Sequence, residues 1–424
     1  MNRVVITGIG AVTPLGNDAE TTWQHLRDGV SGVGRISTFD PTGFPVRIGG
    51  MVKDFTLDPH LANPSQRRHL NRPGEFGLAA AAEALRASGV QGSGAYEPWE
   101  KGISVAGSVG RPSVAEIGDM AHEMSPAGGA GAIARAAPAD VLRNSQNMAA
   151  LQIARVADCE GPMRCVSTAC AGAAHAVGEA LRMVQHDDAA CVVAGGYDAL
   201  TEWLDVIGFG LLGALTTEHD DHPEKASRPF AVDRAGFVIG EGAVMVVVER
   251  EDRALARGAP ILAELAGYGT SLNAYRITDA PPSGEGPDVA MRAALRDAGM
   301  APTDIDHIAV HGTGTPGNDP SETNAIKAVF GAHAEHLLLS SGKSMTGHLT
   351  GAAAGLGLLG AVRAITDGVV HPTINLDVPD PACDLDYVPH VAREALVRAA
   401  LVHAFAFGGT NAVLAVRAHG GEET

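Results

Sequence analysis

The sequence feature that most constrains the fold is a weak internal repeat, in which one order of segments occurs in each half of the chain. The strand-like run Met163–Thr168 turns into the small-residue stretch Ala171–Ala174, and Leu337–Ser344 leads in the same way to Gly351–Gly355. Self-similarity of this kind indicates two related units, and 424 residues exceed one ordinary compact core. We therefore expect two similar halves, related by a two-fold axis, whose equivalent strand ends meet at one central site.

Two further pairs of segments follow the same repeat. Ile103–Gly110 resembles Ile308–Gly314, since each is a strand that ends in a turn of small residues, and Cys191–Gly196 has a counterpart in Ala400–Gly409. The two halves join near Glu251–Pro260. We therefore expect an N-terminal half of residues 1–255 and a C-terminal half of residues 256–424.

The pattern within each half alternates between strand-like runs and alanine-rich helical stretches. This alternation predicts an α/β fold with buried sheets. The predicted strands are Arg3–Gly8, Ile103–Gly107, Arg164–Ser167, Ala190–Gly195 and Phe237–Glu249, and the predicted helices include Phe76–Ser88 and Ala171–His186.

Charge and composition exclude several classes of function. A formal net charge of −18 argues against nonspecific binding to nucleic acid and to an anionic membrane surface. No apolar run reaches the roughly 18 residues that span a bilayer, and the first residues show no secretion signal, so we expect a cytoplasmic protein. The five cysteines form no CxxC pair, which argues against a zinc site or a disulfide framework.

Cys170 lies where a strand turns sharply into a helix. The start of a helix offers unpaired N–H groups and a positive dipole end, which stabilise a thiolate and lower the pKa of a cysteine. A thiolate attacks thioesters readily, and the acyl thioester that forms remains reactive. A small cysteine of the buried core is an equally good interpretation from spacing alone.

His311 and His348 lie in turns of the same kind, each after a strand and among Gly and Thr residues. Two imidazoles could donate hydrogen bonds to the thioester oxygen that becomes negative when a malonyl group loses CO₂. Metal binding is the competing interpretation, but no third ligand stands at a suitable spacing. Lys343, one of only a few lysines, lies in the same turn as His348.

Two glycine-rich turns have different interpretations. The turn in Phe405–Asn411 follows a strand, and its N–H groups could complete an oxyanion hole at Cys170; an ordinary tight turn is the alternative. Gly8-Ile9-Gly10 suggests a dinucleotide site, but Thr13 replaces the third glycine and no ribose-binding acid follows. We therefore expect no nucleotide cofactor.

At these residues the chain resembles the β-ketoacyl-acyl-carrier-protein synthases of the thiolase superfamily. The resemblance runs over almost the whole chain. Its motifs are Thr168-Ala169-Cys170, Ser227-Arg228-Pro229-Phe230, Gly236-Phe237-Val238-Ile239-Gly240-Glu241-Gly242, the His311 and Lys343–His348 segments, and Phe407-Gly408-Gly409-Thr410-Asn411.

The resemblance implies a duplicated five-layered α/β/α/β/α fold and an acyltransferase that performs a decarboxylative Claisen condensation. It implies no metal and no cofactor of the chain's own, because the phosphopantetheine arm belongs to an acyl carrier protein. It also implies a homodimer, or a heterodimer with a homologous chain-length subunit. The implied roles are Cys170 as the acylated nucleophile, His311 and His348 as decarboxylation residues, Lys343 and Glu322 as a supporting ion pair, Thr313 and Thr315 as phosphopantetheine-binding residues, and Cys170, Phe407 and Gly408 as oxyanion hole and gate.

Carrier proteins are acidic, so an enzyme of this charge needs a local basic patch. Arg67 and Arg68, with Arg72 nearby, match the docking region of the family, although a solvated charge cluster is the plain alternative. Gly213 stands where bacterial fatty-acid members usually carry a docking arginine. This departure weakens the inference to a fatty-acid carrier.

Other departures concern the acyl pocket. Ala136-Ala137-Pro138-Ala139-Asp140 replaces a bulky aromatic pair, and Ala406 replaces a glycine between two phenylalanines. Gly317-Asn318-Asp319 resembles aromatic-polyketide ketosynthases. We therefore predict the catalytic ketosynthase subunit of a type II polyketide synthase, with a housekeeping 3-oxoacyl synthase II of fatty-acid elongation as the alternative. A non-catalytic chain-length partner is disfavoured by Cys170, and a degradative thiolase by the two histidines.

Overall fold

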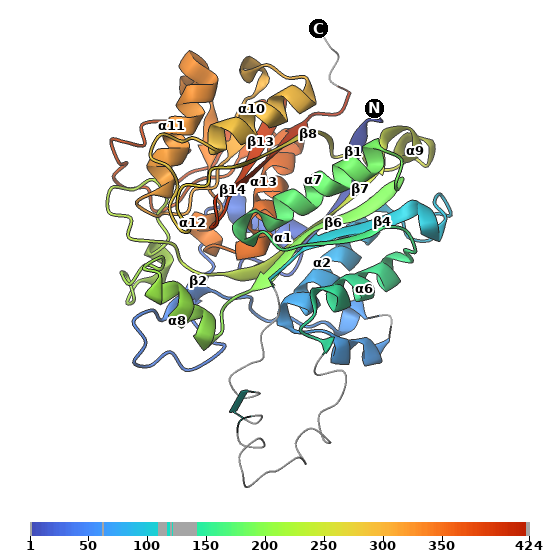
Figure 1. Cartoon of the computed structure of the whole chain (residues 1–424), viewed down its shortest axis with the longest axis horizontal. Coiled ribbons are helices and arrows are strands. Elements are labelled where there is room, and N and C mark those ends of the chain that lie inside the picture. The colour runs from blue at the N-terminus through green and yellow to red at the C-terminus, as the bar shows by residue number, and fades with distance from the viewer. Residues whose placement is uncertain (1, 62, 109–116, 119–120, 122–141, 421–424) are drawn as a thin grey trace.

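The structure, a computed structural model, describes residues 2–61, 63–108, 117–118, 121 and 142–420 (Figure 1). The predicted pocket segment Ala136–Asp140 lies outside these residues. The largest sheet joins ten strands in the order β10-β9-β13-β14-β8-β1-β7-β6-β4-β5 among the described residues. Its strands are β1 (Val4–Val12), β4 (Lys101–Ala106), β5 (Met163–Val166), β6 (Cys191–Ala199), β7 (Glu241–Arg250), β8 (Ala263–Leu272), β9 (His307–Ala309), β10 (Leu338–Ser340), β13 (Ala399–Phe405) and β14 (Thr410–Arg417).

The strand order repeats itself on the two sides of the contact between β1 and β8. Read outward, one side runs β1-β7-β6-β4-β5 and the other runs β8-β14-β13-β9-β10. On both sides the two strands next to the centre pair antiparallel, and the last three pair parallel. The predicted duplication is therefore present in the hydrogen bonding of the sheet. The division at residues 255 and 256 stays a prediction.

The helices form three layers, and the two halves of the sheet lie between them. α2 (Arg72–Ser88) and α6 (Gln146–Ala157) share a core with the N-terminal strands, and α10 (Pro287–Ala298) and α11 (Asn318–Phe330) share one with the C-terminal strands. α7 (Gly172–Gln185) and α13 (Ala353–Asp367) lie in the core between them, in the middle of the molecule in Figure 1. The predicted five-layered α/β/α/β/α fold is confirmed.

Glycines in the two central strands let the outer helices approach closely. A Cβ atom at Gly8 or Gly10 of β1 would lie 2.2 Å from the Ala84 carbonyl oxygen or 2.1 Å from that of Ala80, both in α2. On β8, Gly267 and Gly269 face α10 in the same manner. The Gly8-Ile9-Gly10 motif therefore serves helix packing.

Some predicted boundaries were wrong because loops compete for the ends of strands. The predicted strand Phe237–Glu249 begins only at Glu241, since Phe237, Ile239 and Gly240 form single bridges to residues outside the large sheet instead. β1 is longer than predicted and continues to Val12. Helix α2 begins before Phe76 because the Asn71 side chain accepts a hydrogen bond from the Gly74 amide and caps it.

The remaining elements are short and connect the layers. They are α1 (Ala19–Arg27), α8 (Trp203–Leu211), α9 (Glu251–Ala256), α12 (Lys343–Thr346), β2 (Val33–Arg35), β3 (Ile48–Gly50), β11 (Val369–Val370) and β12 (Arg393–Glu394). Of the helices in the described ranges, none combines the length and the apolar character that crossing a bilayer demands.

Candidate active site

Three of the predicted catalytic side chains, those of Cys170, His311 and His348, line one cavity of about 280 Å³. Cys170 reaches it from the turn after β5, and His311 from the loop after β9. His348 comes from the turn that precedes α13, and Phe407 from the turn between β13 and β14. The repeat thus brings equivalent strand ends to one place, as the sequence indicates.

Cys170 occupies a strained turn that occurs twice in the fold. It follows Ala169, whose φ of 45° is unfavourable for a side-chain-bearing residue, and α7 begins two residues later. In the second half, Thr350 has a φ of 46°, Gly351 follows it, and α13 begins soon after. The Gly351 amide donates to the buried Asp198 carboxylate at 2.9 Å. The equivalent amide of Cys170 instead lowers the pKa of its own thiol.

The ionisation of Cys170 departs from the expectation based on a helix start. Burial, together with the Asp198 charge, raises the pKa of the thiol to about 12, although Lys343 and the N–H groups of Cys170 and Phe407 oppose both effects. The side chain is half-buried and lines the cavity. The free site therefore holds a neutral thiol at pH 7, and the predicted lowering of its pKa is wrong.

His311 and His348 lie side by side as neutral donors. Their ring centroids are 5.5 Å apart and the rings are nearly perpendicular, at 80°. Burial and the neighbouring Lys343 charge hold the pKa of both imidazoles well below the ordinary value. The Thr350 amide donates to Nδ1 of His348 at 3.1 Å, so the hydrogen of this neutral ring is on Nε2.

Lys343 and Glu322 hold the backbone of His311 from two directions. The Lys343 ammonium donates to the His311 carbonyl oxygen. Glu322 accepts from the His311 amide at 2.7 Å through Oε1 and from the Gly312 amide at 2.8 Å through Oε2. Burial lowers the pKa of Lys343 to about 8, with the Glu322 charge opposing this.

The predicted ion pair between Lys343 and Glu322 is wrong. The ammonium and the carboxylate form no direct bond with each other in the described part of the chain. Both are occupied by the His311 backbone, which lies between them.

Sequence reasoning missed three buried groups around this loop. His403 of β13 contacts Glu322, with 2.9 Å between Nδ1 and Oε1. Asp319 accepts from the Phe230 and Gly314 amides and so ties the Ser227–Phe230 motif to the His311 loop. Asp198 is the third. A histidine inside an apolar strand and single acids after short turns or strands carry no distinctive signal, so the sequence offered little to find them.

Thr313 and Thr315 line the cavity beside the catalytic side chains. Their hydroxyl oxygens are 3.0 Å apart, and the Asn318 amide donates to Thr315 at 3.3 Å. The turn that carries them needs positive φ angles of 37° at Gly312 and 78° at Gly314, which glycine adopts readily. The two hydroxyls therefore lie at the wall of the cavity, and their predicted contact with phosphopantetheine stays a prediction.

The predicted oxyanion hole stays a prediction for its donors, the Cys170 and Phe407 amides. Both amides lower the pKa of the Cys170 thiol. Gly408 was a wrong candidate as a donor, because its amide donates to the Ile277 carbonyl oxygen at 2.7 Å. Gly408 instead fastens the Phe407 turn to the neighbouring loop.

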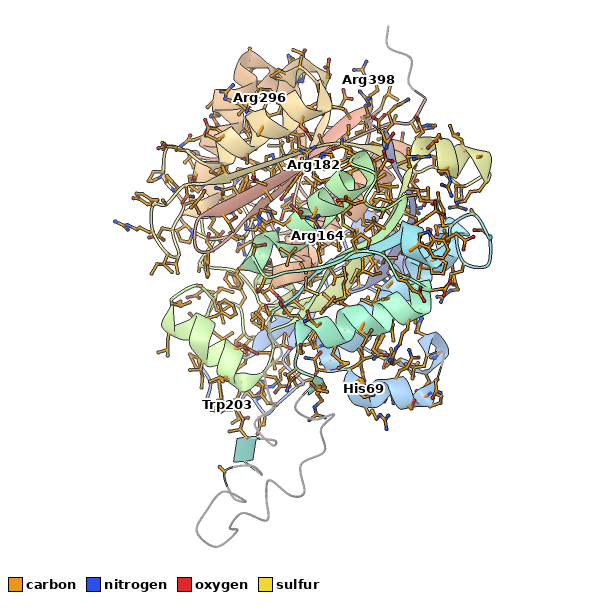
Figure 2. All side chains as sticks on the ribbon, turned by 45° about the vertical axis from the view of Figure 1, so that its right-hand side comes forward. His69, Arg164, Arg182, Trp203, Arg296 and Arg398 are labelled. Atoms are coloured by element: carbon orange, nitrogen blue, oxygen red, sulfur yellow. The ribbon has the colours of Figure 1, made fainter. Side chains whose placement is uncertain are left out.

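The predicted docking arginines divide into two kinds. Arg67 and Arg68 are exposed at the end of a short 3₁₀-helix, and Arg67 pairs with Asp58 at 3.2 Å. Arg72 binds the fully buried Glu241 instead, so its guanidinium supports the fold at the start of α2. Figure 2 shows His69, the neighbour of Arg68, at the opposite end of the molecule from Arg296.

No group of three His, Cys, Asp or Glu side chains in the described ranges could hold a metal ion. Gly213 lines the cavity next to the exposed Leu212. The neighbours of the position where an arginine was expected, Leu212 and Ala214, are therefore apolar.

Comparisons with known proteins agree with this geometry. Family models for the N-terminal and C-terminal domains of beta-ketoacyl synthases match residues 1–254 and 262–377. A 3-oxoacyl-[acyl-carrier-protein] synthase 2 of Coxiella burnetii is 41% identical over 414 residues, which are 97% of each chain. The enzyme of that name from Synechocystis is 40% identical over 98% of each chain.

Solved structures give the same result. The ishigamide ketosynthase/chain length factor is 35% identical, with a TM-score of 0.87 over 99% of this chain and 100% of that one. A type II polyketide ketosynthase in complex with its acyl carrier protein, bound to a hexaketide, is 31% identical, with a TM-score of 0.83 over 98% and 99% of the two chains. The chain belongs to the β-ketoacyl synthase family of acyltransferases, with the thiolase fold.

Proposed function

We propose that this enzyme extends an acyl chain held on Cys170 with a malonyl unit carried by an acyl carrier protein, as a 3-oxoacyl-[acyl-carrier-protein] synthase of the elongation type. The observation that carries the proposal is the joint presence of Cys170, His311 and His348 in one cavity. The elongation type is favoured because the synthase 2 relatives are 40% and 41% identical over nearly the whole chain.

In the first step the Cys170 sulfur attacks the carbonyl carbon of the acyl thioester. The thiol gives up its proton, the carrier's sulfur leaves and takes a proton, and the acyl group remains on Cys170. Negative charge develops on the carbonyl oxygen as the sulfur bonds to carbon. The Cys170 and Phe407 amides, which both lower the pKa of the Cys170 thiol, are proposed to stabilise this charge.

In the second step a malonyl thioester loses CO₂. The electron pair of the broken carbon–carbon bond forms an enolate, whose oxygen accepts hydrogen bonds from His311 and His348. Neutral imidazoles suit this role, because each keeps one N–H to donate, and the lowered pKa of the protonated rings means that no acidic imidazolium is present to protonate the enolate. The enolate carbon then attacks the acyl carbonyl on Cys170, and the Cys170 sulfur leaves.

Thr313 and Thr315 are proposed to bind the phosphopantetheine arm of the carrier, since their hydroxyls line the cavity. The chain needs no cofactor of its own in this scheme. Arg67 and Arg68 are proposed as carrier contacts, while the ion pair of Arg72 with Glu241 leaves its guanidinium less available.

A second candidate is the catalytic subunit of a type II polyketide synthase, the role that the sequence departures favoured. The specific observation for it is the fold similarity to two ketosynthases of polyketide systems, at 35% and 31% identity. Sequence identity favours the elongation enzyme, so this role stands second.

A dimer is proposed on the basis of the sheet edge at β5. This strand is the last of its side of the sheet, and Met163 and Arg164 are exposed. An open strand edge pairs readily with another chain. The homodimer, the heterodimer and the cytoplasmic location all stay predictions.

The test is to incubate the protein with acyl and malonyl carrier proteins and to measure intact mass. Wild type should gain one acyl group and release a 3-oxoacyl carrier, and Cys170→Ala should gain none. Retained acylation of Cys170→Ala would reject the nucleophile. Competing acyl carriers separate the two candidates, because preferred acylation by saturated chains indicates fatty-acid elongation and preferred acylation by chains that keep their oxo groups indicates polyketide synthesis.

A further inference from the structure

A buried histidine on β13 is bonded to the carboxylate that holds the catalytic loop. His403 and Glu322 are both fully buried, and 2.9 Å separate Nδ1 from Oε1. We propose that His403 is a positioning residue for His311, acting through Glu322, and that it serves the decarboxylation half of the reaction. This inference rests on the proposed function and adds His403 to the residues that hold the catalytic side chains of the same site in place.

The hydrogen bonds of Glu322 fix the direction of each donor. A carboxylate only accepts, so Nδ1 of His403 carries the hydrogen. Oε1 therefore accepts from both His403 and the His311 amide, and Oε2 accepts from the Gly312 amide. Oε2 also accepts a longer hydrogen bond of 3.5 Å from the side-chain amide of Asn318. Together these donors set the orientation of the carboxylate against the His311 loop.

His403 also keeps Glu322 apart from Lys343. The two charges attract each other in a buried environment, yet each bonds to the His311 backbone instead. Without the His403 donor, Oε1 loses one of its two hydrogen bonds and can turn towards the ammonium of Lys343. The resulting ion pair would release the backbone of His311 from both sides.

The state of the other ring nitrogen of His403 supports a role for the imidazole as a hydrogen-bond donor through Nδ1. Within the described part of the molecule, Nε2 is buried and has no hydrogen-bond partner. An unpaired buried polar atom is unfavourable, and the neighbouring Val402 and Ala404 are apolar. An apolar residue at position 403 would satisfy packing but would leave Glu322 without this donor.

The proposal predicts a separation of the two half-reactions. Acylation uses Cys170 and the Cys170 and Phe407 amides, none of which bonds to Glu322. Decarboxylation uses the ring of His311, whose backbone Glu322 holds. Displacement of a catalytic group by about 1 Å costs roughly 100-fold in rate. His403→Leu should therefore slow release of CO₂ from malonyl carrier protein by about 100-fold, with acylation of Cys170 close to wild type.

Two amide variants keep the test informative even if the leucine variant fails to fold. His403→Asn places an amide N–H near the position of Nδ1 and should restore decarboxylation. His403→Gln places its amide near the position of Nε2 and should remain slow. His307→Leu is the matched control, because His307 is a buried imidazole on β9 that contacts the Leu338 carbonyl oxygen; it should leave the ratio of the two rates unchanged.

The rates would be measured on folded protein, with CO₂ release for decarboxylation and intact mass for acylation. Equal loss of both half-reactions in His403→Leu and His403→Gln, or no loss in either, would overturn the proposal. Failure of His403→Asn to exceed His403→Gln would do the same. If wild type itself neither acylates Cys170 nor releases CO₂, the proposed function fails instead.

Discussion

Burial shifts the pKa values of Cys170 and Lys343 in opposite directions, and in both cases it favours the neutral form of the side chain. The thiol is raised to about 12 and the ammonium is lowered to about 8. Each charge favours the other, because a thiolate stabilises the ammonium and the ammonium stabilises a thiolate. At neutral pH the site therefore contains a thiol, and the sulfur becomes nucleophilic only as its proton leaves.

The raised thiol pKa gives a prediction for alkylation by iodoacetamide, which reacts with the thiolate. Below its pKa, the thiolate fraction rises about tenfold for each pH unit. The alkylation rate of Cys170 should therefore climb from pH 7 to pH 10 without a plateau, as followed by peptide mass mapping. Cys170→Ala identifies the signal that belongs to this residue. A plateau below pH 8 would contradict a raised pKa and restore the expectation from the helix start.

Sequence patterns found the residues that define the chemistry but not the bonds between them. Cys170, His311 and His348 each stand in a distinctive small-residue turn, so their convergence could be predicted. The direction of the Gly408 amide and the position of His403 opposite Glu322 depend on how separate strands pack. No local pattern records such contacts, which is why the ion pair and the Gly408 donor were wrong.

At the scale of elements, the repeat was the most informative feature of the sequence. It predicted that β5 with α7 and β10 with α13 would be equivalent, and the sheet order bears this out. It did not give the strand ends, because bridges from loops such as Leu215–Phe237 replace regular pairing there. The type of an element follows from local periodicity, whereas its ends depend on which neighbouring segment forms hydrogen bonds with the backbone there.

Glu83 of α2 joins three elements and gives a prediction for stability. Its carboxylate accepts from the Ala11 amide of β1 at 2.9 Å and from the Ala19 amide of α1 at 2.8 Å. Burial raises its pKa from 4.5 to about 7. The folded protein therefore binds this proton more tightly than the unfolded chain. Stability from this group is present below pH 4.5 and is lost as the pH rises to about 7.

Glu83→Gln removes this titration. The free energy of unfolding of the variant, minus that of wild type, should increase by about 3 kcal/mol between pH 4.5 and pH 7.5. Urea unfolding at several pH values measures the difference, and Glu335→Gln, at an exposed position, is the matched control. A difference that stays constant with pH would show that Glu83 has an ordinary pKa.

At the scale of the whole molecule, a net charge of −18 repels an acidic carrier protein. Productive binding then needs a local region of opposite sign or an apolar contact. Arg67 and Arg68 supply adjacent exposed positive charges, although Asp58 and Glu75 partly neutralise Arg67. The exposed Leu212, which lines the cavity beside Gly213, supplies an apolar contact.

Reversal of the two arginine charges distinguishes these contacts. If they bind the carrier, Arg67→Glu with Arg68→Glu should weaken its affinity by about tenfold at low salt, and the loss should shrink as ionic strength rises, because salt screens exposed charges beyond about 8 Å at physiological concentration. Arg292→Glu with Arg296→Glu, on α10, changes the net charge equally and should weaken binding much less. Affinity would be measured by titration calorimetry at two salt concentrations. Equal losses in the two double variants would mean that total charge governs the encounter and that Arg67 and Arg68 form no docking site.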